Sequence, residues 1–433
     1  MNSSSPRTSA PDEIELVIDA VGGHGDGVAT TDQGKVFVPF TVPGDRVRAR
    51  LGMKGKEGTP AVLLEVMAAG AHRIAPPCAH FGACGGCDLQ QWQAAEALDW
   101  KRAQVVATLR QRGLDAPVEP VVATLPGERR RARLSVRRDA EVVEVGFRAR
   151  GSHAIIDVAS CALLDPALGA LLAPLRKLTS DVLQRREEVA VELTLTDSGI
   201  DLLFERSHEP TPAQRSAWAK FATTNRVARI SWRADSEGEP ELLAKLQQPA
   251  MTFGGISVEL PPGTFLQASA TAEAALVAEV VAAAGKARRV LDLYSGCGTF
   301  ALPLLQRASV HALEGSAAAV AALKKAAGAR LTVEQRDLER RPLQKDELKK
   351  VDFVVLDPPR AGARAQSEAL AASAVPVIAY VSCNPATFAR DARTLVDGGY
   401  ALSRVVPVDQ FLWSAHVELV GIFQKSPNGR RGR

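Results

Sequence analysis

Arg288-Arg-Val-Leu-Asp-Leu-Tyr-Ser-Gly-Cys-Gly-Thr-Phe300 predicts a strand, a glycine-containing turn and the start of a helix. Gly296 and Gly298 allow the backbone of that turn to come close to a bound ligand. Because only G-x-G is present, the match to a dinucleotide-binding fold is weak. Glu314 ends the next apolar run, where a carboxylate suits the hydroxyls of a ribose; the alternative is a strand-end glutamate that faces water. The stretch therefore predicts part of a doubly wound α/β domain with a nucleoside cofactor.

Two other apolar runs end in polar tetrapeptides. Phe353–Leu356 is followed by Asp357-Pro-Pro-Arg360, and Val377–Val381 by Ser382-Cys-Asn-Pro385. Such runs are typical of parallel strands buried on both faces, and the carboxyl ends of these strands form the edge where ligands bind. We therefore expect the carboxylate and the thiol to face one crevice. The alternative for Cys383 is a buried thiol at the end of a strand.

The composition is that of an ordinary globular protein. The chain has 433 residues, 46% of them hydrophobic and 24% charged, with a net charge of +4, which suggests about two to three domains. Residues 1–12 are rich in serine and proline, so we expect a disordered lead and neither a secretory signal nor an anchor. The alanine-rich segment 268–287 contains charged residues, which suits an amphipathic helix and not a membrane span. We expect a cytoplasmic protein that does not enter a membrane.

The pattern of apolar residues changes along the chain. Residues 13–68 alternate between apolar and polar in short runs separated by glycine and proline, which indicates a small all-β barrel. Such a barrel serves either as a nucleic-acid handle or as a structural module. Residues 119–248 are mixed, and after Pro261-Pro262 helical patterns and apolar strands alternate to the carboxyl end, as in an α/β domain.

Arginines are concentrated in one part of the chain. Clustered arginine predicts a surface for a phosphate backbone, and the alternative is a solvated strand face. Eight lie in a window of 22 residues: Arg129, Arg130, Arg131, Arg133, Arg137, Arg138, Arg148 and Arg150. Three more, Arg430, Arg431 and Arg433, close the chain.

Four of the six cysteines suggest a metal site. Cys78, Cys84 and Cys87 have the spacing C-x5-C-x2-C, and Cys161 follows much later. Four thiolates suit an iron–sulfur cluster, and they suit tetrahedral zinc equally well. Spacing alone leaves both metals open, and thiols without a metal are the third alternative.

Four motifs follow one another in the second half of the chain: Asp292-Leu-Tyr-Ser-Gly-Cys-Gly-Thr299, Leu356-Asp-Pro-Pro-Arg-Ala-Gly362, Val381-Ser-Cys-Asn-Pro385 and His416-Val-Glu418. Their order resembles that of the S-adenosylmethionine-dependent RNA uracil-5 methyltransferases. Gly22-Gly-His-Gly-Asp-Gly27, Val38-Pro-Phe40 and Pro43-Gly-Asp45 look like the TRAM barrel of that family. Barrel, cluster and catalytic domain together resemble the branch that modifies 23S rRNA, of the RlmD type.

The resemblance implies three folded parts. It implies an OB-like TRAM barrel over residues 13–68 and a mixed α+β iron–sulfur domain over residues 75–91 and 119–255. A Rossmann-like methyltransferase domain would occupy residues 92–118 and 256–433. The implied cofactors are S-adenosylmethionine and a [4Fe-4S] cluster, the implied partner is 23S rRNA, and we expect a monomer. The implied cluster ligands are Cys78, Cys84, Cys87 and Cys161.

The resemblance also implies the residues of the active site. Implied cofactor contacts are Gln267, Tyr294, Thr299, Glu314, Asp337 and Asp357, and implied substrate contacts are Phe265, Asp357 and Arg360, with Phe265 packed on the extruded base. Thr299 and Ser269 stand where the family commonly has asparagine. Both are polar, so we expect the cofactor to bind through altered hydrogen bonds.

The chemistry explains why such residues are needed. Carbon 5 of uracil is a poor nucleophile, and addition of the Cys383 thiolate at carbon 6 makes it enolate-like. Removal of the carbon 5 proton then needs a general base, for which Glu418 is the candidate and His416 an orienting neighbour. Asp357 is expected to bind the uracil edge, and Arg360 a phosphate or the enolate. The target must be single-stranded or flipped out of its helix.

Other functions fit less of the sequence. Asp-Pro-Pro also opens the motif of amino-group methyltransferases, but these usually carry an aromatic residue after the prolines, where Arg360 stands, and need no cysteine. A radical S-adenosylmethionine enzyme would need C-x3-C-x2-C. A non-catalytic RNA-binding protein would tolerate a degenerate pocket, whereas these motifs are intact. The same chemistry on tRNA or at another rRNA position is the nearest alternative.

Overall fold

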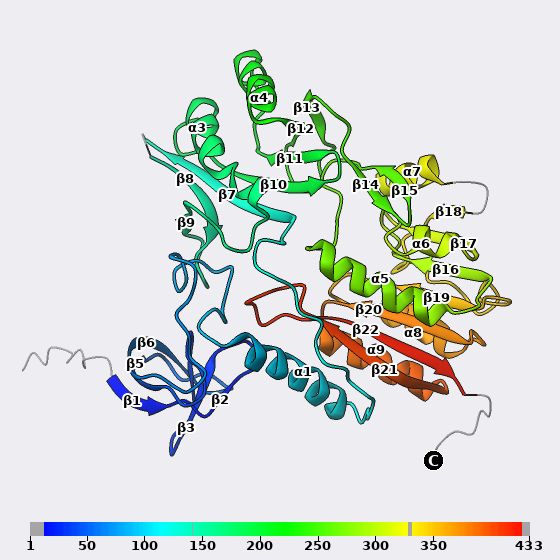
Figure 1. Cartoon of the computed structure of the whole chain (residues 1–433), viewed down its shortest axis with the longest axis horizontal. Coiled ribbons are helices and arrows are strands. Elements are labelled where there is room, and N and C mark those ends of the chain that lie inside the picture. The colour runs from blue at the N-terminus through cyan, green and yellow to red at the C-terminus, as the bar shows by residue number, and fades with distance from the viewer. Residues whose placement is uncertain (1–12, 141, 328–330, 427–433) are drawn as a thin grey trace, which may run out of the picture. The chain divides into compact units, whose positions relative to one another are not determined.

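The computed structural model describes residues 13–140, 142–327 and 331–426 (Figure 1). The predicted disordered lead, residues 1–12, and the arginines at the end of the chain lie outside these residues. The chain divides into two compact units, and the division falls within helix α1 (Ala94–Gln111). One unit comprises the chain up to Lys101 with Trp413–Ala415, and the other comprises Arg102–Leu412 and the chain from His416 onward.

The first unit contains a six-stranded sheet in residues 13–68. In β5, Val47 and Ala49 are buried while Arg46 and Arg48 are exposed, so the period of two places one face of the strand on a small core. The strands are β1 (Glu13–Val17), β2 (Ala20–Val21), β3 (Gly27–Thr31), β4 (Gly34–Val38), β5 (Arg46–Leu51) and β6 (Thr59–Ala68), in the sheet order β1-β5-β6-β4-β3-β2.

The second unit begins with a seven-stranded sheet covered by helices. All neighbouring strands are antiparallel except the parallel pair β11 and β12. Trp218 of α4 packs on Phe204 with ring centroids 5.5 Å apart, which joins helix and sheet. The strands, in the order β13-β12-β11-β10-β7-β8-β9, are β7 (Arg131–Asp139), β8 (Val142–Arg148), β9 (Ile155–Asp157), β10 (Glu188–Thr196), β11 (Gly199–Glu205), β12 (Val227–Arg233) and β13 (Glu241–Lys245). The helices are α2 (Pro166–Gly169), α3 (Leu172–Val182) and α4 (Pro212–Asn225).

A second seven-stranded sheet follows a hairpin of β14 (Ala250–Phe253) and β15 (Ile256–Glu259). Its order is β18-β17-β16-β19-β20-β22-β21. The first five are parallel, and β22 is antiparallel to both of its neighbours. The strands are β16 (Arg289–Leu293), β17 (Ser309–Glu314), β18 (Leu331–Gln335), β19 (Phe353–Leu356), β20 (Val377–Ser382), β21 (Tyr400–Val408) and β22 (Glu418–Lys425). This is the doubly wound α/β sheet that the apolar runs predict.

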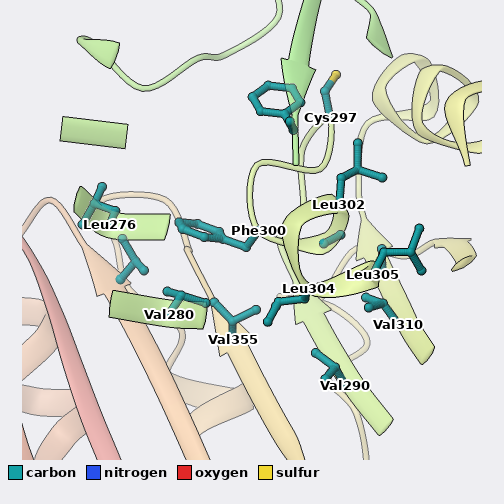
Figure 2. Close-up of a cluster of buried hydrophobic side chains, with 14 of the residues drawn as sticks. Leu276, Val280, Val290, Cys297, Phe300, Leu302, Leu304, Leu305, Val310 and Val355 are labelled. Carbon is teal, nitrogen blue, oxygen red and sulfur yellow. The ribbon is translucent and has the colours of Figure 1, made fainter. Parts of the chain in front are cut away.

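Both faces of this sheet are buried, as continuous apolar strands require. Consecutive residues point to opposite faces of the sheet, so Val290 lies in one core and Leu291 in another. Helices α5 (Ala270–Ala284), α6 (Ala301–Leu305) and α7 (Ala317–Ala326) contribute to the first core, and α8 (Arg364–Ala371) and α9 (Pro385–Asp397) to the second. Cys297 lies in the first core among apolar side chains (Figure 2), so it fills space in the glycine loop.

Within the described part of the chain, no helix combines the length and the apolar character that crossing a bilayer requires.

Candidate active site

The carboxyl edge of the parallel strands collects the predicted residues. Leu293, at the end of β16, pairs with the end of β17 and with the end of β19. The residues that follow these strands therefore stand side by side, namely Tyr294 after β16 and Asp357 after β19, with Glu314 closing β17. The chain order reverses between β16 and β19, which is where ligands bind in such sheets.

The antiparallel strand β22 completes the edge. Ser382 of β20 pairs with Leu419 of β22, and the next position in this register sets Cys383 beside Glu418. Two residues 35 positions apart in sequence thus become neighbours because β22 is inserted next to β20. This juxtaposition gives the site a thiol and a carboxylate.

Cys383 lies between β20 and α9. Asn384 caps the helix by accepting from the Ala386 N–H, and its side chain donates to the carbonyl of Arg360 at 3.2 Å. Burial and the charges of Glu418 and Asp357 raise the pKa of the Cys383 thiol to about 11, against the opposing effect of Arg360. The thiol therefore needs positive charge nearby to ionise.

Asp357 is held by one neighbouring side chain. The amide Nε2 of Gln267 donates to its Oδ2 at 3.0 Å. Burial raises the pKa of Asp357 from 3.8 to about 7, and the bond from Gln267 opposes this shift. Gln267 is fixed in turn through its backbone carbonyl, which accepts a hydrogen bond from Arg130 Nε at 2.9 Å.

Glu418 is almost fully buried, with 3% of its surface exposed. Burial and the neighbouring Asp357 raise its pKa well above the ordinary value, and a hydrogen bond from Gln410 Nε2 to Oε2, 3.0 Å long, opposes the rise. His416, expected as the orienting neighbour, is exposed and stacks edge-on near Phe411. A hydrogen bond to Glu418 comes from Gln410, and the orienting role of His416 stays a prediction.

The glycine loop fits a polar ligand. Glu314 accepts from the Gly296 N–H at 2.9 Å and from the Ser316 N–H at 2.8 Å, so its carboxylate also shapes the loop. A Cβ at Gly296 would meet nothing within 4 Å, so the space beside the loop is open. Among the described residues, no hydrogen-bond partner reaches the buried atoms Gln267 Oε1 and Ser295 Oγ. A polar ligand would satisfy such atoms, and the site therefore fits a nucleoside cofactor.

The other implied cofactor residues differ in setting. Tyr294 has a φ of 61° and lines a cavity of about 240 Å³ together with Leu338. Asp337 is half-exposed and accepts from the backbone N–H groups of Glu339 and Arg340. Ser269, one of the two departures from the family pattern, caps α5 by accepting from the Ala272 N–H. A second cavity, of about 250 Å³, is lined by Phe265, Leu266, Arg129, Arg131, Phe411 and Gln410, among others.

The arginine window is largely neutralised. The sequence concentrates its positive charge, but the fold brings glutamates from distant strands to the same places. Arg133 pairs with Glu192 at 2.8 Å and with Glu205 at 2.7 Å, and Arg137 pairs with Glu144 at 2.7 Å. Several of the clustered arginines therefore face carboxylates of the same protein, and the phosphate surface stays a prediction. Arg131 remains notable, because its guanidinium lies 5.1 Å from the ring centroid of Phe265, which is 62% exposed.

The predicted cluster gains no support. Cys78, Cys84 and Cys87 belong to the first unit and Cys161 to the second. Across the described residues, no group of three or more histidine, cysteine, aspartate or glutamate side chains is arranged to hold a metal ion. The iron–sulfur cluster therefore stays a prediction from the resemblance.

Comparison with known proteins identifies the family. The sequence model of tRNA (uracil-5-)-methyltransferases matches residues 256–426. An uncharacterized RNA methyltransferase of Mesorhizobium japonicum is 41% identical over 96% of this chain and 99% of its own length. The 23S rRNA (uracil(1939)-C(5))-methyltransferase RlmD of Chromohalobacter salexigens is 37% identical over 96% of this chain and 90% of its own. The chain belongs to the RNA (uracil-5-)-methyltransferase family.

The fold agrees with this membership of the RNA (uracil-5-)-methyltransferase family. The tRNA (uracil-54, C5)-methyltransferase of Pyrococcus abyssi, solved with S-adenosyl-L-homocysteine, superposes with a TM-score of 0.75 over 95% of this chain and all of that one. Sequence identity is 22%, so the likeness concerns the fold alone.

Two residues of this methyltransferase site escaped the sequence analysis. Gln410 stands in no motif, and only its nearness to Glu418 in the chain could have pointed to it. Arg130 was counted as one of a cluster, whereas it anchors the Gln267 loop and forms an ion pair with Glu273. Long-range hydrogen bonds of this kind leave no local pattern.

Proposed function

We propose that this enzyme transfers a methyl group to carbon 5 of a uridine in 23S rRNA. The observation that carries the proposal is the register between β20 and β22, which makes Cys383 and Glu418 neighbours beside the cofactor loop. The relative that methylates 23S rRNA, similar over nearly the whole chain, supports the substrate class.

The proposed reaction begins with the thiol. Cys383 loses its proton to water and its sulfur bonds to carbon 6, which pushes the π electron pair of the carbon 5–carbon 6 double bond toward carbon 5 and the carbonyl at carbon 4. Arg360 favours the thiolate, because its charge acts against the raised pKa of Cys383. Asp357 would hydrogen-bond the uracil edge.

S-adenosylmethionine, when bound, supplies the methyl group that carbon 5 accepts. Gln267, Tyr294, Thr299, Glu314, Asp337 and Asp357 are the residues that would hold it. Glu418 then takes the carbon 5 proton, the double bond reforms, and the thiolate of Cys383 leaves. The base must be ionised for this step, and the raised pKa of Glu418 works against its ionised form.

The substrate would enter at the cavity beside Phe265. Phe265 offers an exposed ring for stacking on a flipped base. Arg131 lies over that ring at 5.1 Å and supplies a positive charge for the neighbouring phosphate. An aromatic ring and a guanidinium at one entrance suit an unpaired nucleotide.

RNA containing 5-fluorouridine tests the proposal, because fluorine at carbon 5 cannot be removed as a proton and traps the adduct. Incubation with S-adenosylmethionine should give a covalent complex with the wild type and with Cys297→Ala, the control for loss of a cysteine near the cofactor loop. Cys383→Ala should give none. An adduct that persists in Cys383→Ala would overturn the assignment, and mapping of the methylated uridine in rRNA and tRNA decides the substrate.

On the family resemblance alone, we also propose that Cys78, Cys84, Cys87 and Cys161 bind a [4Fe-4S] cluster. No step above depends on it. Iron and acid-labile sulfide analysis of protein prepared without oxygen tests this proposal. Zinc in place of iron would favour the alternative metal, and absence of both would end it.

A further inference from the structure

One buried side chain joins the candidate base to the cavity beside Phe265. Gln410 follows β21 and has 5% of its surface exposed. Its Oε1 accepts from the Ala268 N–H at 2.8 Å, and its Nε2 donates to Glu418 Oε2 at 3.0 Å. Because a backbone N–H can only donate, the oxygen must face Ala268, and this fixes Nε2 toward the carboxylate.

The Gln410 amide, held in this way, orients the Glu418 carboxylate and does not itself accept the proton that Glu418 must take. The bond takes up one lone pair of Glu418 Oε2, so Oε1 is the oxygen with more freedom to take a proton. Asp357 and Cys383 are ionisable groups that face Glu418, and an acidic residue in the place of Gln410 would add to the effect of Asp357 on the pKa of Glu418. A neutral donor orients the base and favours its ionised form.

One segment of four residues, Phe265–Ala268, is linked by hydrogen bonds to Asp357 directly and to Glu418 through Gln410. In the segment Phe265–Ala268, Phe265 lines the cavity, Gln267 donates to Asp357, and Ala268 holds Gln410. Arg130 anchors the segment at two points, since Nε donates to the carbonyl of Gln267 and its N–H to the carbonyl of Ala268, both at 2.9 Å. The segment that lines the cavity beside Phe265 is thus joined through Gln410 to Glu418, the candidate base.

We propose that Gln410 is a positioning residue for proton abstraction, which holds Glu418 in the orientation that removes the carbon 5 proton. The inference rests on the proposed function and adds a residue that acts on one step of it. Arg130 still anchors the segment Phe265–Ala268 when Gln410 is replaced, so thiol addition and methyl transfer should change much less than proton removal.

Two substrates separate these steps. In Gln410→Met, which keeps the length of the side chain and removes both hydrogen bonds, adduct formation with 5-fluorouridine RNA should stay within about twofold of the wild type, because this substrate stops before proton removal. With ordinary uridine RNA, release of methylated product should slow by about tenfold to a hundredfold, the range expected for a hydrogen bond to a charged group. The covalent complex should accumulate in this second reaction.

The matched control is Gln366→Met. Gln366 is another buried glutamine, with 1% exposed, whose Oε1 accepts from the Leu343 N–H at 2.9 Å. It does not contact Glu418, so its replacement should not separate the two substrates. The double variant Gln410→Met with Glu418→Ala should be no slower than Glu418→Ala alone, because the effect passes through Glu418.

A second variant covers the case in which Gln410→Met does not fold. Gln410→Glu can keep the bond from Ala268 but sets a carboxyl group against Glu418, so it should also stall release while adduct formation persists. Equal slowing of both substrates, or a further loss on top of Glu418→Ala, would overturn the inference. A wild type that forms no Cys383-dependent adduct would instead refute the proposed function.

Discussion

Replacing Asp357 by asparagine should stabilise the protein at neutral and alkaline pH. The folded state holds this carboxyl with a pKa of about 7 against an ordinary value of 3.8. Between these two values the unfolded chain releases the proton while the folded chain keeps it, so stability falls as pH rises. Each pH unit costs about 1.4 kcal/mol, and the cost reaches about 4 kcal/mol above pH 7. Water reaches the half-buried side chain, so we expect a gain of about 2–4 kcal/mol in Asp357→Asn.

The assay is urea unfolding of both proteins, followed by circular dichroism at several pH values. The gain should be full at pH 8, should fall below about 1 kcal/mol near pH 4, and should vanish below about pH 3, where both states carry the protonated carboxyl. Asp391→Asn is the matched control: Asp391 is fully buried but accepts from Tyr380 Oη at 2.8 Å and from Arg390 Nε at 2.8 Å, so its replacement should destabilise. A gain in Asp357→Asn that is equally large at pH 4.5 and pH 8 would refute the ionisation argument.

Two further changes test neighbouring parts of the site. Arg360→Met should raise the pKa of Cys383 above its value of about 11, because a positive charge is lost. Iodoacetamide labelling of Cys383 at pH 8, followed by mass spectrometry, should therefore slow. Unchanged labelling would contradict this expectation. Arg130→Met should destabilise by about 3–5 kcal/mol, since it leaves Glu273, with 13% of its side chain exposed, without its partner. Arg137→Met, which removes a more exposed ion pair, should cost at most about 1 kcal/mol, and similar losses in the two variants would refute the argument from burial.

The strands of the catalytic sheet were predictable because their signal is local. Phe353–Leu356 and Val377–Val381 are apolar throughout, as strands buried on both faces must be, and the structure has β19 and β20 there. The polar groups after these runs had to meet at one edge, because parallel strands share a direction. The sequence alone was therefore enough to assign Cys383 and Asp357 to the same edge of the sheet.

The arginine window shows where local patterns mislead. A run of arginines on β7 and β8 appears as free positive charge in the sequence, but Glu192 and Glu205 lie on β10 and β11 and reach Arg133 across the sheet. Pairing between strands depends on register, which no window of sequence contains. The glutamate partners of these arginines could therefore not be predicted from the arginine window.

The sequence by itself determined the strands, the glycine loop, the thiol and the family of this protein, because each is set by residues close together in the chain. Only the tertiary structure decided that Glu418 stands beside Cys383, since this depends on β22 entering the sheet antiparallel between β20 and β21. It also decided the partner of Glu418 and the raised pKa of Asp357. Burial and long-range hydrogen bonds exist only after the chain has folded, and they set the chemistry of this site.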